Sequence, residues 1–336
     1  MTLRLRPDKI GSVCTPFEFG PYIKVRPQPH CAEGAAVAVR VLTSRDDYGH
    51  LELPSGRMSK LVPGDVIVGV LGNRAALRGF AGRIPSKLNA DEELHLLNVG
   101  GVLGVSEGRA VGLGEPIRLQ VLGAPILADR PALLSDFALP VPAPYQNGTK
   151  IIGVVGTCMN SGKSTAASVL IRSLRARGLR VHAGKATGVG AIKDILSFRD
   201  NGAALGLSFL DCGVPSTAFR NDVPEIYKSL ISHLAEEAPD VIVIELGDGL
   251  FGEYGVDEII AGNPGFATTI VAANDVIGGW AAVQRLQSHN IPVSVVTGPA
   301  TDNLAAVAKF QSLKIPAANI MREPQQFTDY VLGDIS

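Results

Sequence analysis

Apolar runs of strand length recur through the second half of the chain, and a segment long enough for a helix follows each one. The runs are Ile151–Val155, Val181–Ala183, Val241–Ile244, Thr268–Ala272 and Val293–Val296. This alternation predicts an α/β domain with a doubly wound parallel sheet, whose ligands bind at the carboxyl ends of the strands. The run Val241–Ile244 is wholly apolar, as expected for a strand buried on both faces.

The first half has a different pattern, in which short apolar stretches alternate with turn signals such as Pro63-Gly64. The stretches are Ala36–Leu42, His50–Leu53, Asp65–Leu71, Leu77–Ile84, Leu94–Val99, Gly101–Val105 and Pro116–Leu122. Frequent short strands with few helical patterns predict a mostly-β domain, a small barrel or a sandwich. Alternating prolines in residues 140–150 indicate an extended linker. We therefore expect a mostly-β domain over 1–140, which recognises substrate or builds an oligomer, and the α/β domain over 150–336.

Composition narrows the function classes. The 336 residues are 46% hydrophobic and 19% charged with net charge −1, and this balance gives no support for nucleic-acid binding. No apolar run is long enough to span a bilayer, and the N-terminus lacks the apolar core of a signal peptide. The four cysteines are scattered and form no CxxC, which argues against a disulfide framework or a zinc site. We expect a cytoplasmic protein without a membrane or nucleic-acid partner.

The strongest motif follows the predicted strand Ile151–Val155. A polar turn ending in Gly162-Lys163-Ser164-Thr165 leads into an amphipathic helical pattern, and Gly178 stands where a helix C-cap would. Strand, loop and helix N-terminus in this order are the context of a phosphate-binding P-loop. Its N–H groups and the helix dipole would surround a β-phosphate, Lys163 would reach the β/γ oxygens, and Ser164 would bind Mg²⁺. Gly156 lies one position earlier than the first glycine of the usual pattern, and Thr157 stands where that glycine would be.

The buried strand Val241–Ile244 ends in Glu245-Leu-Gly-Asp248-Gly249. In a parallel sheet this places a carboxylate beside the P-loop, in the Walker B role of organising Mg²⁺. Asp248 is either a further catalytic carboxylate or a turn residue of an Asp-Gly pair.

Four features of residues 151–300 resemble the dethiobiotin synthetase and cobyrinate amidotransferase branch of P-loop enzymes. They are the loop Gly156-Thr157-Cys-Met-Asn-Ser-Gly162-Lys163-Ser164, the strand ending at Gly184-Lys185-Ala-Thr187-Gly188, the strand ending in Glu245-Leu-Gly-Asp-Gly249, and the strand–helix–strand unit from Thr268 to Thr297. The early glycine of the loop is itself a feature of that branch. The resemblance covers the C-terminal half only.

The resemblance implies a set of roles. The nucleotide would be held by the loop residues Gly156, Thr157, Asn160, Ser161, Gly162, Lys163, Ser164 and Thr165. Lys163 would bind the β/γ-phosphates, Lys185 would touch substrate or γ-phosphate, and Glu245 would organise the metal with Ser164. The family also uses an aspartate shortly after its second strand, for which Asp200 is the best positional match, with Asp194 and Asp211 as rivals. We expect Asp200 to bind the metal with Ser164 and Glu245. We expect four residues to be catalytic: Lys163, Lys185, Glu245 and Asp248.

The chain also departs from the family. Leu246 follows Glu245 where the family has glycine, and the first half is absent from the simple synthetases. The segment Asp211–Thr217 has no clear counterpart, and we expect it either to determine specificity or to be an ordinary loop. The substrate is therefore not expected to be the family's namesake.

These residues predict an ATP- and Mg²⁺-dependent enzyme that moves the γ-phosphoryl group onto a small molecule. The product of transfer to a carboxylate or carbamate would be a mixed anhydride, which an amine could displace to make a C–N bond. A ligase and a small-molecule kinase would use the same parts and remain open alternatives. We also expect a homo-oligomer.

The alternative from another class is a nucleotide switch, either a metallochaperone-type GTPase or a partition-type ATPase. The partition type carries a lysine where this chain has Cys158. A guanine site would show Asn-Lys-x-Asp, and the chain offers only Ala273-Asn274-Asp275-Val276. ATP thus rests on the resemblance and on this missing signature, and Thr297–Ala300 is a candidate base-contacting loop.

Overall fold

The computed structural model describes residues 2–143, 145 and 148–335. Within it the chain forms two compact units. The first comprises Met1–Pro140 together with two later segments, Val189–Lys193 and Phe209–Phe219. The second comprises Val141–Gly188, Asp194–Ser208 and Arg220–Ser336. No helix of the described residues is both long enough and apolar enough to cross a membrane.

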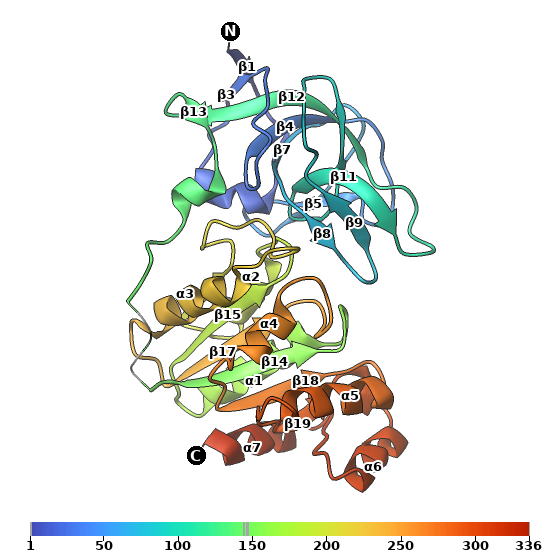
Figure 1. Ribbon diagram of the computed structural model, residues 1–336, viewed down its shortest axis with the longest axis vertical. Helices are drawn as coiled ribbons and strands as arrows, with labels where there is room; N and C mark the ends of the chain where they lie inside the picture. The colour runs from blue at the N-terminus through green and yellow to red at the C-terminus, as the bar shows by residue number, and fades with distance from the viewer. Residues whose placement is uncertain (1, 144, 146–147, 336) are drawn as a thin grey trace. The chain divides into compact units, whose positions relative to one another are not determined.

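The second unit is built on a parallel sheet of six strands (Figure 1). They are β14 (Lys150–Gly156), β15 (Val181–Thr187), β16 (Leu205–Ser208), β17 (Val241–Leu246), β18 (Thr268–Ala272) and β19 (Val295–Thr297). The order across the sheet is β16-β15-β17-β14-β18-β19, and every neighbouring pair is parallel. All carboxyl ends therefore meet at one edge, and β14 lies between β17 and β18 there.

Helices connect and cover these strands. They are α1 (Lys163–Ala176), α2 (Lys193–Asp200), α3 (Val223–Ala235), α4 (Val256–Ala261), α5 (Val276–Gln287), the 3-10 turn η3 (Pro299–Thr301), α6 (Leu304–Ser312) and α7 (Pro324–Ile335). Helix α1 packs on the central strands and on α7, whereas α3 packs on β15, β16 and β17 and on α4. Leu170, Ile171 and Leu174 of α1 are buried with Ile152 and Val154 of β14 in one core. The apolar face predicted for this helix is thus the face that holds it on the sheet.

The first unit is strand-rich. Its elements are β1 (Leu3–Leu5), β2 (Lys9–Ile10), η1 (Ser12–Phe17), β3 (Ile23–Arg26), β4 (Ala36–Val41), β5 (His50–Glu52), β6 (Met58–Lys60), β7 (Val66–Leu71), β8 (Arg74–Ala75), β9 (Phe80–Arg83), β10 (Glu93–Leu96), β11 (Val102–Arg109), β12 (Arg118–Leu127), β13 (Arg130–Pro131) and η2 (Leu134–Phe137). Pairing runs β12-β4-β7-β11-β10 and returns to β12, which closes a five-stranded barrel. Only the β7–β11 pair in this ring is parallel. The sequence left a barrel and a sandwich open, and the structure is a barrel.

An apolar core fills this barrel. Val37 and Val39 of β4, Ile67 and Leu71 of β7, and Leu119 of β12 are buried in it without measurable exposure. These residues alternate with outward-facing positions along their strands, as closure of a sheet requires.

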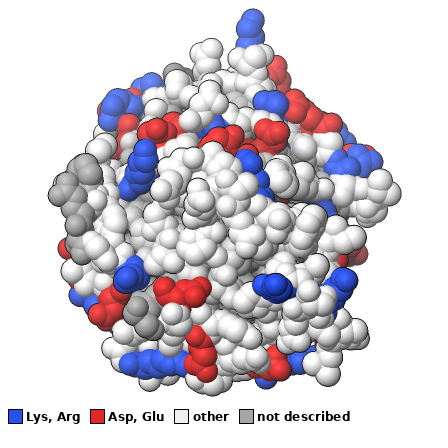
Figure 2. Space-filling view, turned by 60° about the horizontal axis from the view of Figure 1, so that its bottom comes forward, with Lys and Arg blue, Asp and Glu red and all other residues white. Residues whose placement is uncertain are grey.

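Charged side chains are interspersed on the molecular face drawn in Figure 2. Lysine and arginine alternate there with aspartate and glutamate, and uncharged residues cover the middle of that face. Neither sign of charge gathers into a continuous patch on it.

Candidate functional site

The loop that follows β14 has the geometry of a phosphate loop. Gly156 ends the strand, and a Cβ there would lie 2.5 Å from Ser161 Oγ and 2.9 Å from Lys163 Cδ, so the loop closes tightly only over glycine. Gly162 caps α1 with φ +96°, a left-handed conformation that glycine adopts without strain. Helix α1 then begins at Lys163. The N–H groups of its first turn have no intrahelical acceptor and point out of the helix end, where an anion is favoured.

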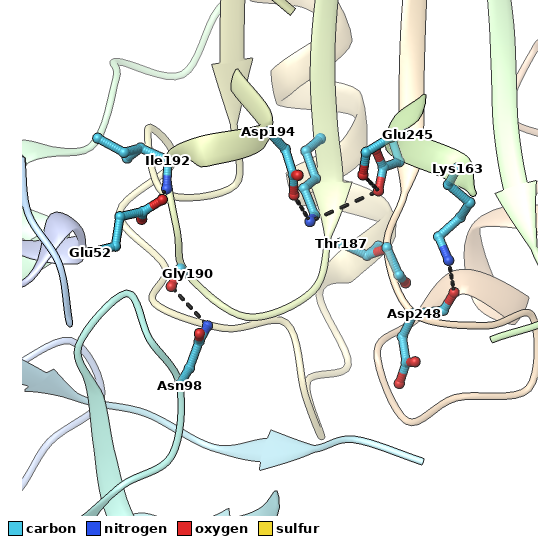
Figure 3. Close-up of polar contacts among 12 residues, drawn as sticks. Glu52, Asn98, Lys163, Thr187, Gly190, Ile192, Asp194, Glu245 and Asp248 are labelled. Carbon is cyan, nitrogen blue, oxygen red and sulfur yellow. Dashed lines mark hydrogen bonds and ion pairs between the residues drawn. The ribbon is translucent and has the colours of Figure 1, made fainter. Parts of the chain in front are cut away.

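The turn after β17 lies against this loop. Leu250 N donates to Gly156 O over 3.1 Å, and a Cβ on Gly249 would lie 2.5 Å from Thr157 O. Lys163 Nζ donates to the carbonyl oxygens of Cys158, at 2.8 Å, and of Asp248 (Figure 3). The lysine therefore connects the phosphate loop to the turn that carries the predicted Walker B segment.

A row of ionisable and hydroxyl side chains crosses the strand ends beside this lysine. Ser164 Oγ donates to Glu245 Oε1 over 3.2 Å, and the same oxygen lies 3.9 Å from Lys185 Nζ. Lys185 in turn forms an ion pair with Asp194 of α2 (Figure 3). Sheet register explains the row, because Lys185 of β15 and Val154 of β14 both pair with Glu245 of β17.

Burial sets the electrostatics of the row. Glu245 is 2% exposed, and its pKa is raised by burial and by the Asp194 carboxylate, against the two lysines and Ser164. Lys163 is 5% exposed, and its pKa is lowered by burial and by the Lys185 cation, against Glu245 and Asp248. The carboxylate of Glu245 and the ammonium of Lys163 therefore favour each other's charged form, and a bound anion or cation would change the pKa of both.

The residues predicted to hold a nucleotide all lie on this loop, but they differ in exposure. Asn160 and Thr165 are exposed, Ser161 is buried, and Thr157 is half-buried. Thr157 N donates to Ala272 O at the end of β18 over 3.0 Å. Asp248 has φ 65° and lies in the turn after β17, within the sequence that predicted an Asp-Gly turn.

Sequence reasoning preferred Asp200 as the aspartate after the second strand, and the structure places Asp194 beside Lys185 instead. Asp200 is the exposed last residue of α2, whereas Asp194 is buried in its first turn. The two aspartates are six positions apart along the helix, a rise of about 9 Å. The signal was available, because the residues that open a helix after a strand end lie closest to the ligand edge.

Two further groups at this edge went unrecognised as loop neighbours. Asn274, after β18, donates from Nδ2 to Cys158 Sγ over 2.8 Å. Gly298, after β19, has φ +89°, and a Cβ there would lie 2.3 Å from Ser161 O. The ends of β17, β18 and β19 thus all touch the phosphate loop.

The donor set suits a magnesium ion bound together with a phosphate chain. Glu245 Oε2 is buried without a hydrogen-bond partner among the described residues, and Ser164 Oγ lies against the other carboxylate oxygen. No group of three or more His, Cys, Asp and Glu able to hold a metal occurs in the described chain. Mg²⁺ needs no such group, since it is usually bound by one or two protein oxygens, water and substrate phosphates.

Comparisons with known proteins gave structural likenesses only. No protein-family model and no curated protein matches the chain. The signal recognition particle receptor FtsY from Elizabethkingia anophelis matches at 15% identity and a TM-score of 0.39, over 59% of this chain and 70% of that one. The kinase domain of the Escherichia coli tyrosine kinase ETK matches at 12% identity and 0.32, over 45% and 68%.

A DUF1611 family protein from Anabaena variabilis matches at 15% identity and a TM-score of 0.42, over 57% of this chain and 63% of that one. The chain thus spans less than two thirds of that protein's length. All three scores lie below 0.5, and the assignment of a P-loop α/β fold stands on the strand order and loop geometry described above.

Proposed function

We propose that the second unit binds ATP with Mg²⁺ and transfers its γ-phosphoryl group to a small molecule. One observation carries the proposal. The Ser164–Glu245–Lys185–Asp194 row lies beside the phosphate-loop lysine, at the carboxyl ends of a parallel sheet. Two cations, a buried carboxylate and a helix N-terminus converge there, and phosphoryl transfer needs such charge neutralisation more than covalent help.

Nucleotide binding would change the partners of Lys163. Its ammonium contacts two carbonyl oxygens, that of Cys158 in the phosphate loop and that of Asp248 in the turn after β17. A β/γ-phosphate offers charged acceptors, which form stronger hydrogen bonds than neutral carbonyls. The lysine would therefore turn from the carbonyls to the phosphates. The phosphate charge would then offset the effect of burial, which lowers the pKa of Lys163.

Ser164 and Glu245 would hold the magnesium ion, the carboxylate directly or through water. When bound, Mg²⁺ neutralises charge on the transferring phosphoryl group and fixes its oxygens. Glu245 would be needed in its ionised form, which burial disfavours and the neighbouring lysines favour. The oxygen without a partner is the one that such an ion would satisfy.

Lys185 would act on the group being transferred. An acceptor oxygen would form a bond to the γ-phosphorus while the bond to the β–γ bridging oxygen breaks and ADP leaves. The Lys185 ammonium, held by Asp194, would offset the charge that develops on the phosphoryl oxygens. A kinase would stop at this product, whereas a ligase would let an amine displace the phosphate from an acyl phosphate.

The dethiobiotin synthetase-like sequence features support ATP and a ligase or kinase as the finer assignment. Glu245, Lys185 and the early-glycine loop are the residues that carry this resemblance. The asparagine of Ala273-Asn274-Asp275 bonds to Cys158, a use unlike recognition of guanine.

A screen for ADP release stimulated by small metabolites tests the proposal. Wild-type protein should bind ATP with Mg²⁺ and turn it over faster with a suitable acceptor. Lys163→Ala should remove turnover, and Lys185→Met should reduce acceptor-dependent turnover strongly with a modest loss of nucleotide affinity. If nucleotide changes oligomeric state and no small molecule stimulates turnover, the protein is a switch. Unchanged turnover in Lys163→Ala would exclude the P-loop site altogether.

A further inference from the structure

The loop between β15 and α2 joins the two members of an ion pair. Lys185 lies near the end of β15, and Asp194 lies in the first turn of α2. Most of that loop and the first residue of α2, Val189–Lys193, belong to the first unit by their contacts. Asp194 directly follows these five residues, so their arrangement affects where its carboxylate lies.

Asn98, in the turn between β10 and β11, holds one point of the loop. Its Nδ2 donates to Gly190 O over 2.9 Å, and Gly190 N donates to Pro215 O over 2.8 Å (Figure 3). Asn98 is itself oriented, because Gly100 N donates to its Oδ1 over 3.2 Å. Both backbone polar groups of Gly190, its N–H and its carbonyl oxygen, are thus fixed within the first unit.

Glu52, the last residue of β5, holds a second point. Its side chain has no measurable exposure, and its Oε2 accepts from Ile192 N over 2.8 Å and from the Ser12 hydroxyl (Figure 3). Ile192 precedes α2, so this carboxylate also lies where a helix N-terminus favours negative charge. Its other oxygen, Oε1, has no hydrogen-bond partner among the described residues.

The backbones in contact here leave no room for side chains. A Cβ on Gly100 would lie 2.0 Å from Gly190 O, and one on Gly190 would lie 2.6 Å from Val13 Cγ1. Close apposition of this kind limits the loop to one arrangement, because any shift must break the hydrogen bonds of Asn98 and Glu52.

We propose that Glu52 and Asn98 are positioning residues that hold the loop so that Asp194 keeps Lys185 in place. Thr187 fixes the other end of the loop, since its hydroxyl donates to Gly247 O over 3.0 Å. Ile192 lies two residues before Asp194, so a shift of its N–H moves the carboxylate that contacts Lys185. The catalytic consequence rests on the proposed function, whereas the positioning itself does not.

Hydrogen exchange of the full-length protein measures the first step. In Asn98→Ala and Glu52→Ala, exchange in peptides covering residues 188–194 should rise about fivefold to tenfold, since each variant removes a hydrogen bond that restrains the loop. Exchange in β4 should stay unchanged, which shows that the barrel remains folded. Glu52→Gln keeps an oxygen acceptor for Ile192 N and should behave nearly as wild type. Glu93→Gln, an exposed carboxylate paired with Arg118, is the matched control.

Labelling of Lys185 by an acylating reagent, followed by mass spectrometry, measures the second step. Loosening the loop should release Lys185 from Asp194, and its labelling rate should rise about threefold or more as the lysine becomes accessible. The exposed Lys193 serves as the internal reference. Faster exchange in the loop with unchanged Lys185 labelling would overturn the proposal. The same change in Glu93→Gln would overturn it as well.

Nucleotide assays separate this proposal from the function proposed above. With a functional enzyme, Asn98→Ala should lower kcat for acceptor-dependent turnover and leave ATP affinity within about twofold, because the P-loop is untouched. If wild-type protein binds no nucleotide, the proposed function fails, and the labelling result alone decides whether Glu52 and Asn98 position Lys185.

Discussion

Lys163 illustrates how a residue that we propose to bind phosphate lowers the stability of the protein without nucleotide. Burial lowers its pKa, and the two carbonyl contacts offset only part of the loss of water. A phosphate-loop lysine must nevertheless lie within the loop to reach a phosphate. The residue is therefore strained electrostatically until a ligand supplies the counter-charge.

We predict that Lys163→Met stabilises the nucleotide-free protein at pH 7 while removing ATP binding. The folded-state pKa lies below the ordinary value of 10.5, so the penalty is fully present below the folded pKa and fades as pH rises toward 10.5. Thermal unfolding should show a midpoint about 2–4 °C higher, the effect of roughly 1 kcal/mol in a domain of this size. The gain over wild type should shrink as pH rises. A variant less stable than wild type at pH 7 would contradict this account.

The choice between Asp194 and Asp200 gives a second prediction. Asp194→Asn removes the partner of a buried lysine and should destabilise the protein by about 3–5 kcal/mol at most, the range for breaking buried pairs. It should also cut acceptor-dependent turnover at least about tenfold. Asp200→Asn should change stability by no more than about 0.5 kcal/mol, because its side chain is exposed. Chemical denaturation and turnover of both variants decide the matter, and a larger effect from Asp200→Asn would restore the sequence-based choice.

At the scale of elements, the turn after β17 and the phosphate loop depend on each other. Gly249→Ala would place a methyl group 2.5 Å from a backbone oxygen of the loop, which cannot move aside as a side chain can. We expect destabilisation of about 1–3 kcal/mol, as for other overpacked sites, and weaker ATP binding. Gly333 of α7 has open space around its Cα, so Gly333→Ala should instead stabilise by up to about 1 kcal/mol. Urea denaturation compares the two, and equal effects would show that crowding at Gly249 is relieved elsewhere.

The elements that sequence predicted are those with a strong apolar signal. Strands at Ile151–Val155, Val241–Ile244 and Thr268–Ala272 were confirmed, because strands buried on both faces are nearly continuous apolar runs. Strand β16, Leu205–Ser208, was missed, since its two leucines alternate with glycine and serine and are only half-buried at the edge of the sheet. The predicted strand at Val293–Val296 begins two residues later, at Val295.

In the barrel, each of the seven predicted stretches overlaps a strand, and the short strands β1, β2, β3, β6, β8 and β13 were missed. Motif spacing predicted the phosphate loop, Lys185 and Glu245, and it named Asp194 only as a rival of Asp200. It could not predict Glu52 or Asn98, because their contacts join residues far apart along the chain.

At the scale of the molecule, the two units are interleaved along the sequence. The sequence pattern divides the chain once, at the linker. By their contacts in the structure, however, Val189–Lys193 and Phe209–Phe219 belong to the first unit. Phe209 and Leu210 in the second of these segments are buried. A cut at the linker would therefore separate these segments from the contacts that order them.

We predict that a fragment of residues 141–336 is cleaved by protease within 189–193 or 209–219 at least about tenfold faster than the full-length chain. Segments that lose their packing open at low free-energy cost and are the first to be cut. Mass spectrometry of limited digests identifies the sites, with cleavage in β17 as the reference for global unfolding. Equal resistance of the fragment would show that the second unit orders these segments by itself.

The interleaving also determines when, during synthesis of the chain, the first unit can finish folding. All strands of the barrel ring have been synthesised once Leu127 has been added, but Phe219 follows Pro140 by about 80 residues, a delay of about 4–16 s at ordinary translation rates. The Asn98 amide and the Glu52 carboxylate lack their partners until Gly190 and Ile192 have been added, about 50 residues after Pro140. The ribosome-bound barrel is thus an unfinished unit, and its last packing step occurs only while the second sheet is being made.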